Sequence, residues 1–393
     1  MTPDFDEIID RRGTRCNKWD DMQAAYGVSP DDGISMWVAD MDFRPPAAVQ
    51  AALQSLLDHG VYGYPGRNDA YLDAICWWQQ NRHGWQIGHG DILTVHGLVN
   101  GTALAVAAYT RPGDGVCVMS PVYHAFGRVI RAAGRELVEL PMQIEDGLYH
   151  FDAAAWDARM TGHERAFILC SPHNPGGRVW SEDELRAIAD FCIRHDLVLI
   201  SDEIHQDIIM PGAPRHIPTA LAAPQVMDRL VVLSSATKTF NIAGAHIGHA
   251  IIPDPALRKA YQDQMAALGL SPGLFGLPMV TAAYSPEGAE WVDALCTYLD
   301  GNRRLFDDAV NAIPGLQSMP LQATYLAWVD FAGTGMDRTE FTARVERDAR
   351  IAANHGPTFG AGGDSFMRFN LATPRARVRE AAARLQAAFT DLQ

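Results

Sequence analysis

The sequence predicts an α/β fold with a mainly parallel central sheet covered by helices, joined to a smaller α+β domain. Between about residues 91 and 250, short apolar runs alternate with helical stretches, and this alternation is typical of βαβ units. After about residue 280 the pattern changes to a long helix followed by separate strand-like pieces. We therefore expect a large domain over residues 46–284 and a small domain built from residues 1–45 and 285–393.

The central sheet is predicted from runs that lack polar alternation, which indicates strands buried on both faces. These runs are Ile92–Val95, Gly115–Met119, Ala166–Cys170, Leu197–Ile200 and Leu230–Leu233. The helix before Leu197 begins at a capping box formed by Ser181 and Glu184. An apolar helix over 102–110 is expected to follow the turn at 96–101.

The remaining elements are predicted from helix signals and aromatic runs. The Pro45–Pro46 pair can start a helix that Gly60 ends. Residues 1–45 are expected to be irregular and to return to the small domain. The other expected elements are helices over about 69–83, 287–312, 339–353 and 375–391, and strands at 324–329 and 366–371.

The composition excludes several classes of function. Hydrophobic residues make up 48% and charged residues 20% of the chain, which is ordinary for a soluble enzyme. The net charge of −15 argues against nucleic acid as a partner, since phosphate binding needs clustered Lys and Arg. The six cysteines show no metal-ligand spacing, so we expect no metal site and buried free thiols. No signal peptide or membrane-length apolar run is present, so we expect a cytoplasmic protein without membrane contact.

Lys238 stands just past the end of a predicted buried strand, surrounded by small hydroxyl residues. A lysine in this position lies over the edge of the sheet, where desolvation can lower its pKa. For a single lysine the simpler reading is a solvated loop residue. The residues that follow the other predicted strands favour a functional role for Lys238.

Polar or aromatic residues also follow the other strands, at the edge where open α/β sheets bind ligands. The turn at 96–101 opens a helix whose free N–H groups suit a phosphate. Tyr123, Asn174 and Asp202 follow the next three strands, and each alone could be structural. Arg368 interrupts an apolar strand, which suits a guanidinium reserved for a carboxylate. Together these groups match the needs of pyridoxal 5′-phosphate (PLP), namely a lysine, a carboxylate for the ring nitrogen and a phosphate cradle.

Four segments resemble the fold type I PLP-dependent enzymes of the class I/II aminotransferase superfamily: Asn-Pro-Gly-Gly (174–177), Ser-Asp-Glu-Ile-His (201–205), Ser-Ala-Thr-Lys-Thr-Phe-Asn (235–241) and Met-Arg-Phe-Asn-Leu-Ala-Thr-Pro-Arg (367–375). Three more segments are similar to the MalY/PatB-type cystathionine β-lyases, or C–S lyases: Trp-Val-Ala-Asp-Met-Asp-Phe (37–43), Tyr-Gly-Tyr-Pro (62–65) and Pro-Val-Tyr-His (121–124). The resemblance runs nearly end to end.

This resemblance implies a role for each matching residue. Lys238 would carry PLP as a Schiff base and shuttle a proton, and Asp202 would pair with the ring nitrogen. Arg368 would bind the substrate α-carboxylate. The other implied cofactor contacts are Asn174 at the ring hydroxyl, Tyr123 stacked on the ring, and Leu98, Val99, Ser235 and Thr237 at the phosphate. Tyr64 would reach the phosphate from a neighbouring subunit, which implies a homodimer with shared active sites.

Two residues depart from the broader aminotransferase pattern. His205 stands where those enzymes commonly have tyrosine, and histidine is usual in the C–S lyase branch. His246 stands where many of them have a phosphate-binding arginine. The phosphate would then depend more on backbone and hydroxyl donors, or on a partly charged imidazole.

The leading hypothesis is PLP-dependent β-elimination on an L-cysteine S-conjugate such as cystathionine, giving a thiol, pyruvate and ammonia. Lys238 would remove the Cα proton as general base. An aminotransferase is the first alternative, since it shares every residue named. A PLP-binding protein that regulates another protein is the second alternative.

Overall fold

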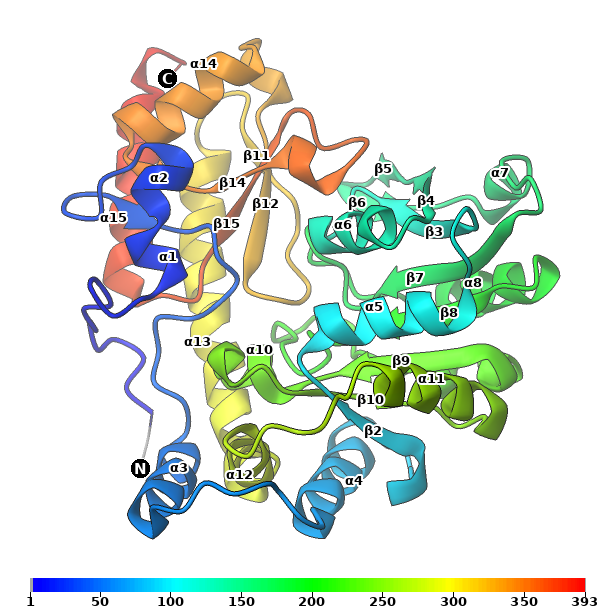
Figure 1. The fold of residues 1–393 in the computed structure, drawn as a ribbon. Coiled ribbons are helices and arrows are strands. Elements are labelled where there is room, and N and C mark those ends of the chain that lie inside the picture. Colours follow the sequence, from blue (N-terminus) through cyan, green and yellow to red (C-terminus); the bar gives the residue numbers. More distant parts are fainter. Residues whose placement is uncertain (1–2, 393) are drawn as a thin grey trace.

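The computed structural model describes residues 3–392 and has two main sheets (Figure 1). The larger sheet has seven strands in the order β2 (Ile92–Val95), β10 (Gly248–Ile251), β9 (Leu230–Ser234), β8 (Val198–Asp202), β7 (Glu164–Cys170), β3 (Gly115–Ser120) and β4 (Glu136–Pro141). Only β10 runs antiparallel to its neighbours, β2 and β9. The prediction of a mainly parallel sheet is therefore confirmed.

Helices cover both faces of this sheet, and side chains of each strand alternate between the two layers. In β9, Val231 and Leu233 belong to the apolar cluster under α5 (Leu98–Tyr109), α6 (His124–Ala132) and α11 (Pro255–Ala267). Val232 points to the opposite cluster, under α7 (Ala153–Asp157) and α8 (Glu182–Arg194). The capping box of α8 is present as predicted, with Ser181 Oγ accepting from the Glu184 N–H. The strands are thus buried on both faces, as their uninterrupted apolar runs require.

The second sheet is antiparallel, in the order β11 (Gln317–Ser318), β12 (Leu326–Asp330), β15 (Phe366–Asn370) and β14 (Asn354–His355). The helices α13 (Pro286–Asn311) and α15 (Arg375–Ala388) lie against each other beside it (Figure 1). The N-terminal strand β1 (Ile34–Ser35) pairs in parallel with β13 (Ile351–Ala352). The N-terminal segment therefore returns to the C-terminal part of the chain, and the boundaries of the two domains stay a prediction.

The remaining elements are short or peripheral. They are α1 (Asn17–Asp20), α2 (Met22–Tyr26), α3 (Ala47–His59), α4 (Asp69–His83), α9 (Thr219–Ala222), α10 (Ala236–Thr239), α12 (Gly276–Ala283), α14 (Arg338–Ala343) and the hairpin β5 (Gln143–Glu145) with β6 (Leu148–His150). Short 3₁₀ turns lie at His89–Asp91, Pro224–Arg229, Ala243–Ala245, Ala332–Thr334, Gly356–Phe359 and Thr390–Leu392. Within residues 3–392, no helix combines the length and apolar character needed to span a bilayer.

The expectation that residues 1–45 are irregular was wrong in part, since this segment contains α1, α2 and β1. Three predicted boundaries were also wrong. The helix expected over 102–110 begins at Leu98, because Gly97 allows the chain to turn directly from β2 into α5. The helix expected over 339–353 ends with a π-helical turn at Arg344–Asp348, and the chain then enters β13. The strand expected from Thr324 begins at Leu326, since Thr324 has a φ of 71°, outside the β region.

Candidate active site

A cavity of about 410 Å³ lies at the carboxyl ends of the parallel strands. This volume is in the range of cofactor and small-molecule sites. Its walls come from the turns after β2, β3, β7, β8 and β9, together with the N-terminal segment. Nine of the predicted site residues line it: Leu98, Val99, Tyr123, Asn174, Asp202, His205, Thr237, Lys238 and His246.

Lys238 lies in α10, the single helical turn that follows β9. Its Nζ donates a hydrogen bond to the backbone carbonyl of Ala39 at 2.5 Å. Desolvation by burial lowers the pKa of Lys238 to about 8; the nearby Arg368 charge lowers it further, whereas the charges of Asp40 and Asp202 oppose the shift. A substantial fraction of the amine is therefore neutral near physiological pH and can accept a proton.

Asp202 is the last residue of β8 and is only 5% exposed. In residues 3–392 its carboxylate accepts one hydrogen bond, from the Ile204 N–H at 3.1 Å. Burial raises the pKa of Asp202 to about 7, and the charge of Glu203 also raises it. A buried carboxylate with so few donors is stabilised by a positively charged N–H placed in the cavity.

Glu203 is the neighbouring residue and is also buried, but it has a full set of partners. Its carboxylate accepts from His216 Nε2 at 3.0 Å, from the Thr219 N–H at 3.0 Å and from Ser201 Oγ at 3.0 Å. Burial would raise its pKa, but the hydrogen bond and charge of His216 outweigh burial and lower it. Glu203 therefore has a structural role away from the cavity wall.

The helix α5 begins at the cavity, where Gly97 has a φ of 80° and ψ of 163°. This conformation is open almost only to glycine. It directs the first-turn N–H groups of Leu98 and Val99, which lack intrahelical acceptors, to the cavity. The hydroxyl-bearing Thr237 lines the same end, so the structure brings together a backbone and hydroxyl cradle for an anion.

Of two further residues predicted for the phosphate, Ser235 does not line the cavity and His246 does. Ser235 lies below the cavity wall as the N-cap of α10: its Oγ accepts from the Thr237 N–H and donates to the Ile247 carbonyl at 2.7 Å. It supports Thr237 rather than lining the cavity. His246 does line the cavity, and its backbone is left-handed with a φ of 45°.

Aromatic and amide groups also line the cavity. Tyr123 precedes α6, and its ring contacts the ring of Phe126 edge-on at 5.6 Å. Asn174 is 4% exposed and its Oδ1 accepts from Arg368 Nη1 at 2.9 Å. His205 is buried, and its Nδ1 has no partner in the described part of the chain. Burial lowers the pKa of His205 to about 3, so a neutral imidazole faces the cavity.

Arg368 lies in the middle of β15 and is buried, but it is not part of the cavity wall. Its guanidinium donates to the carbonyl of Trp37 at 2.9 Å and to Asn354 Oδ1 at 2.5 Å, besides Asn174. Burial lowers the pKa of Arg368 to about 10. It pairs with no carboxylate among residues 3–392. Its positive charge can therefore pair with the carboxylate of a ligand.

Sequence reasoning missed the groups that come from the N-terminal segment. The Ala39 carbonyl accepts from Lys238 and also from Tyr325 Oη at 3.0 Å. A backbone carbonyl leaves no signal in the sequence, although Ala39 lies within the quoted segment 37–43. Tyr64 is fully exposed and lies outside the cavity, so its expected role depends on a second copy of the chain.

A lysine, a partner-poor carboxylate and a helix N-terminus around one cavity, at the carboxyl edge of such a sheet, define a PLP-dependent class of enzyme. The residues fit the cofactor, since Asp202 lines the space that the cofactor would fill and its carboxylate accepts one hydrogen bond among the described residues. The family model for aminotransferase class I and II matches residues 32–385. The chain belongs to that family.

Similar proteins include a cystathionine β-lyase and a PLP-bound C–S lyase. The chain is 36% identical to cystathionine β-lyase PatB of Bacillus subtilis, over 98% of this chain and 100% of the relative. The structure resembles cystalysin from Treponema denticola, which contains a pyridoxal 5′-phosphate cofactor, with a TM-score of 0.95, 34% identity and full coverage of both chains. It also resembles a PLP-bound putative aminotransferase from Clostridium difficile, with a TM-score of 0.94, 34% identity and coverage of 99% and 100%. The resemblance inferred from the motifs is confirmed.

Proposed function

We propose that this protein is a PLP-dependent carbon–sulfur β-lyase that cleaves cystathionine or a related L-cysteine S-conjugate. The observation that carries the proposal is the placement of Lys238 and the partner-poor Asp202 in one cavity, in a chain related over its whole length to a cystathionine β-lyase. The overall reaction converts the S-conjugate and one water into a thiol, pyruvate and ammonium.

Each residue has a separate task in this reaction. When bound, PLP supplies an electron sink for the charge left at Cα. Lys238 holds the cofactor and moves the Cα proton, for which a pKa near 8 is suited. Asp202 keeps the ring nitrogen protonated, and Arg368 with Asn174 binds the α-carboxylate. Fixing the carboxylate orients the Cα–H bond towards the lysine.

A pyruvate assay without a keto-acid acceptor tests this function. We expect one pyruvate per thiol released from cystathionine, and we expect Lys238→Ala to lower kcat by about 10³-fold or more, because the general base is lost. Amino-group transfer to 2-oxoglutarate without pyruvate would instead establish the aminotransferase alternative. That alternative is kept because the Clostridium difficile neighbour is described as a putative aminotransferase.

We also propose that the protein is a homodimer in which Tyr64 reaches the partner's cavity. Several large apolar side chains near α3 and α12 are exposed: Leu57 at 47%, Val61 at 67%, Tyr62 at 51%, Tyr64 at 100% and Phe275 at 44%. Tyr62 and Phe275 contact each other with ring centroids 5.5 Å apart, so part of this surface is continuous. Exposed apolar surface of this kind favours a protein partner, and a second copy would bring Tyr64 to a site.

A further inference from the structure

The Val38–Asp42 segment reaches the cavity at Ala39, although it has no helix or strand. Its Ala39 carbonyl accepts hydrogen bonds from Lys238 Nζ at 2.5 Å and from Tyr325 Oη at 3.0 Å. Among the described residues, this carbonyl is the one hydrogen-bond acceptor of the lysine amine. The position of the segment therefore decides where the free amine lies.

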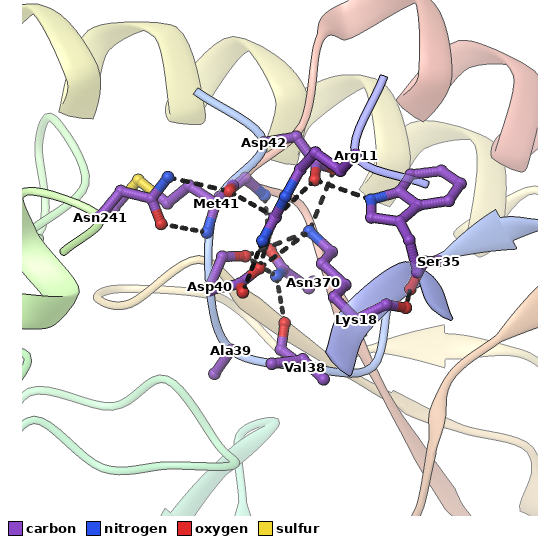
Figure 2. Close-up of polar contacts among 12 residues, drawn as sticks. Arg11, Lys18, Ser35, Val38, Ala39, Asp40, Met41, Asp42, Asn241 and Asn370 are labelled. Atoms are coloured by element: carbon purple, nitrogen blue, oxygen red, sulfur yellow. Dashed lines mark hydrogen bonds and ion pairs between the residues drawn. The ribbon is translucent and has the colours of Figure 1, made fainter. Parts of the chain in front are cut away.

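Contacts with residues distant in sequence, most of them side chains, hold the backbone of this segment, and no strand within residues 3–392 pairs with it. The Asp42 N–H donates to the Ala372 carbonyl at 2.9 Å. Asn370 Nδ2 donates to the carbonyls of Val38 and Asp40, both at 2.6 Å. Asn241 forms a two-way contact with Met41, accepting from its N–H and donating to its carbonyl, both at 2.9 Å. Figure 2 shows these amides on either side of the segment. The irregular backbone thereby finds the partners it needs.

A buried cluster of charges holds the far end of the segment (Figure 2). Lys18 and Asp42 are both fully buried at the side chain, with Nζ and Oδ2 3.1 Å apart. Lys18 Nζ also donates to the carbonyl of Asp40 at 3.1 Å. Arg11 Nη1 contacts Asp40 Oδ1 at 2.8 Å and Asp42 Oδ1 at 2.9 Å. Lys18 and Arg11 thus each contact carboxylates of the segment itself.

Stability alone does not explain this cluster, because burying charged groups costs free energy of desolvation. Burial raises the pKa of Asp42, but the Lys18 charge, the Trp19 indole donor and the charges of Arg11 and Arg377 together outweigh burial and lower it to about 2. The attraction between two buried charges offsets this cost only when their geometry is good. Well-packed apolar residues of similar volume often give a protein the same stability. A charged pair here is therefore better explained by what it positions than by the stability it adds.

Lysine is rare in this chain, which makes Lys18 more notable. The sequence contains three lysines, Lys18, Lys238 and Lys259, among 32 basic residues. Lys259 lies on the surface, paired with Asp263. At position 18 the compact ammonium group reaches a carboxylate and a backbone carbonyl together, which a planar guanidinium is less suited to do.

We infer that Lys18 and Asp42 are positioning residues whose ion pair fixes the Val38–Asp42 segment, so that the Ala39 carbonyl holds the Lys238 amine in the cavity whenever the amine is not bonded to the cofactor. The inference rests on the proposed function, because it assigns a task in the reaction that Lys238 performs. The charged groups facing Lys238 are Asp40, Asp202 and Arg368. Loosening the segment would move the Ala39 carbonyl and the Asp40 charge away from the amine.

Two variants and a control test this inference. Asp42→Asn removes the charge but keeps the shape, and Arg11→Met loosens the same cluster at a side chain that is 21% exposed. Asp307→Asn is the matched control, since Asp307 is a mostly buried carboxylate held by Arg303 and Ser318, away from the cavity. Competitive amine labelling of the cofactor-free protein across pH reports the protonation of Lys238, with the exposed Lys259 as internal reference. Steady-state kinetics of the holoenzyme give kcat and KM.

In both variants we expect Lys238 to become reactive at a pH about one unit lower than in the wild type, because the charged amine loses its acceptor. We expect kcat to fall about tenfold with a smaller change in KM, since the base is misplaced by a fraction of an ångström. The control should keep the wild-type labelling profile and kcat.

Unchanged labelling and kcat in variants that melt as the wild type does would overturn the inference. A lower melting temperature without a shift in Lys238 labelling would show a merely structural role and also overturn it. If Asp42→Asn does not fold, Arg11→Met decides the question. The labelling does not depend on turnover, so a wild type that forms no pyruvate would refute the proposed function and still leave this inference testable.

Discussion

Asp202 and Glu203 are adjacent and both buried, yet their carboxyl groups have opposite pKa shifts. Burial dominates at Asp202 and raises its pKa to about 7, whereas donors from His216 and Thr219 lower the pKa of Glu203. The difference follows from where each side chain points, into the cavity or into a set of donors. Only Asp202 is available to a ligand.

The raised pKa of Asp202 has a consequence for stability against pH in the cofactor-free protein. Between about pH 4 and 7 the folded state keeps a proton that the unfolded state has released, so stability is lost as pH rises through this window. Asparagine cannot ionise, so the free energy of unfolding of Asp202→Asn should not fall in this way as pH rises. Between pH 5 and pH 8 we expect the free energy of unfolding of the variant, relative to the wild type, to rise by about 3 kcal/mol, because pH 5 lies two units below the folded-state pKa of about 7. Urea unfolding at the two pH values measures this difference.

The same variant should bind PLP more weakly, because the ring nitrogen loses its charged partner. Glu203→Gln is the matched comparison: it removes a carboxylate whose pKa is lowered, so it should destabilise the protein at both pH values. An identical pH dependence for Asp202→Asn and the wild type would contradict the assignment of Asp202 as the buried, partner-poor acid.

At the scale of elements, the turn from β2 into α5 depends on Gly97. Its φ of 80° and ψ of 163° would strain any residue with a Cβ by about 1–3 kcal/mol. We expect Gly97→Ala to lower the free energy of unfolding by that amount and to weaken PLP binding about tenfold, because the first N–H groups of α5 move. Equilibrium dialysis and urea unfolding measure the two effects.

Gly90→Ala provides the control for this substitution. Gly90 lies in the 3₁₀ turn before β2, has no positive φ, and an added Cβ meets no atom within 4 Å. It should leave stability and PLP affinity close to those of the wild type. Equal behaviour of the two alanine variants would remove the turn from the proposed phosphate site.

The five strands with long apolar runs could be predicted from the sequence, because burial on both faces leaves an uninterrupted pattern. Strand β10 was not predicted: it has four residues, and one of them is the buried His249. The start of α5 at Leu98 was not predicted, because the apolar residues Leu98 and Val99 are equally compatible with a turn and with an apolar helix. The π-helical turn at 344–348 likewise has no local signal, since pairing of β13 with β1 determines where the helix must end.

The site was predictable to the extent that its side chains follow strands. Lys238, Asp202, Asn174 and Tyr123 meet at one cavity because parallel strands end at a common edge. The contribution of Ala39 could not be foreseen, since it depends on a contact between residues 199 positions apart. The functions of the individual residues stay predictions until the variants are made.

At the scale of the whole molecule, the exposed apolar side chains near α3 predict self-association. Sedimentation should give a particle of twice the 43.0 kDa chain mass. Val61→Asp should shift this species towards the monomer and weaken PLP binding, because a charge in an apolar interface is costly. Tyr64→Phe should keep the dimer and weaken PLP binding through the lost hydroxyl.

Ile144→Asp is the matched control for the interface variant. Ile144 is 46% exposed, comparable to the interface residues, but lies in the β5–β6 hairpin. It should leave the sedimentation coefficient unchanged. A monomeric wild type that binds PLP fully would contradict both the dimer and the role of Tyr64.

The antiparallel strand β10 also holds the backbone of Lys238 in place. Lys238 lies in the connection between β9 and β10, and β9 pairs with β8 on its other side while β10 pairs with β2. The lysine is thus carried between two interior strands, which open only in large cooperative fluctuations. The Val38–Asp42 segment has no such ladder. It depends on the donors Asn241, Asn370 and Lys18 instead, so loosening these contacts would shift the Ala39 carbonyl while the backbone of Lys238 stays in place.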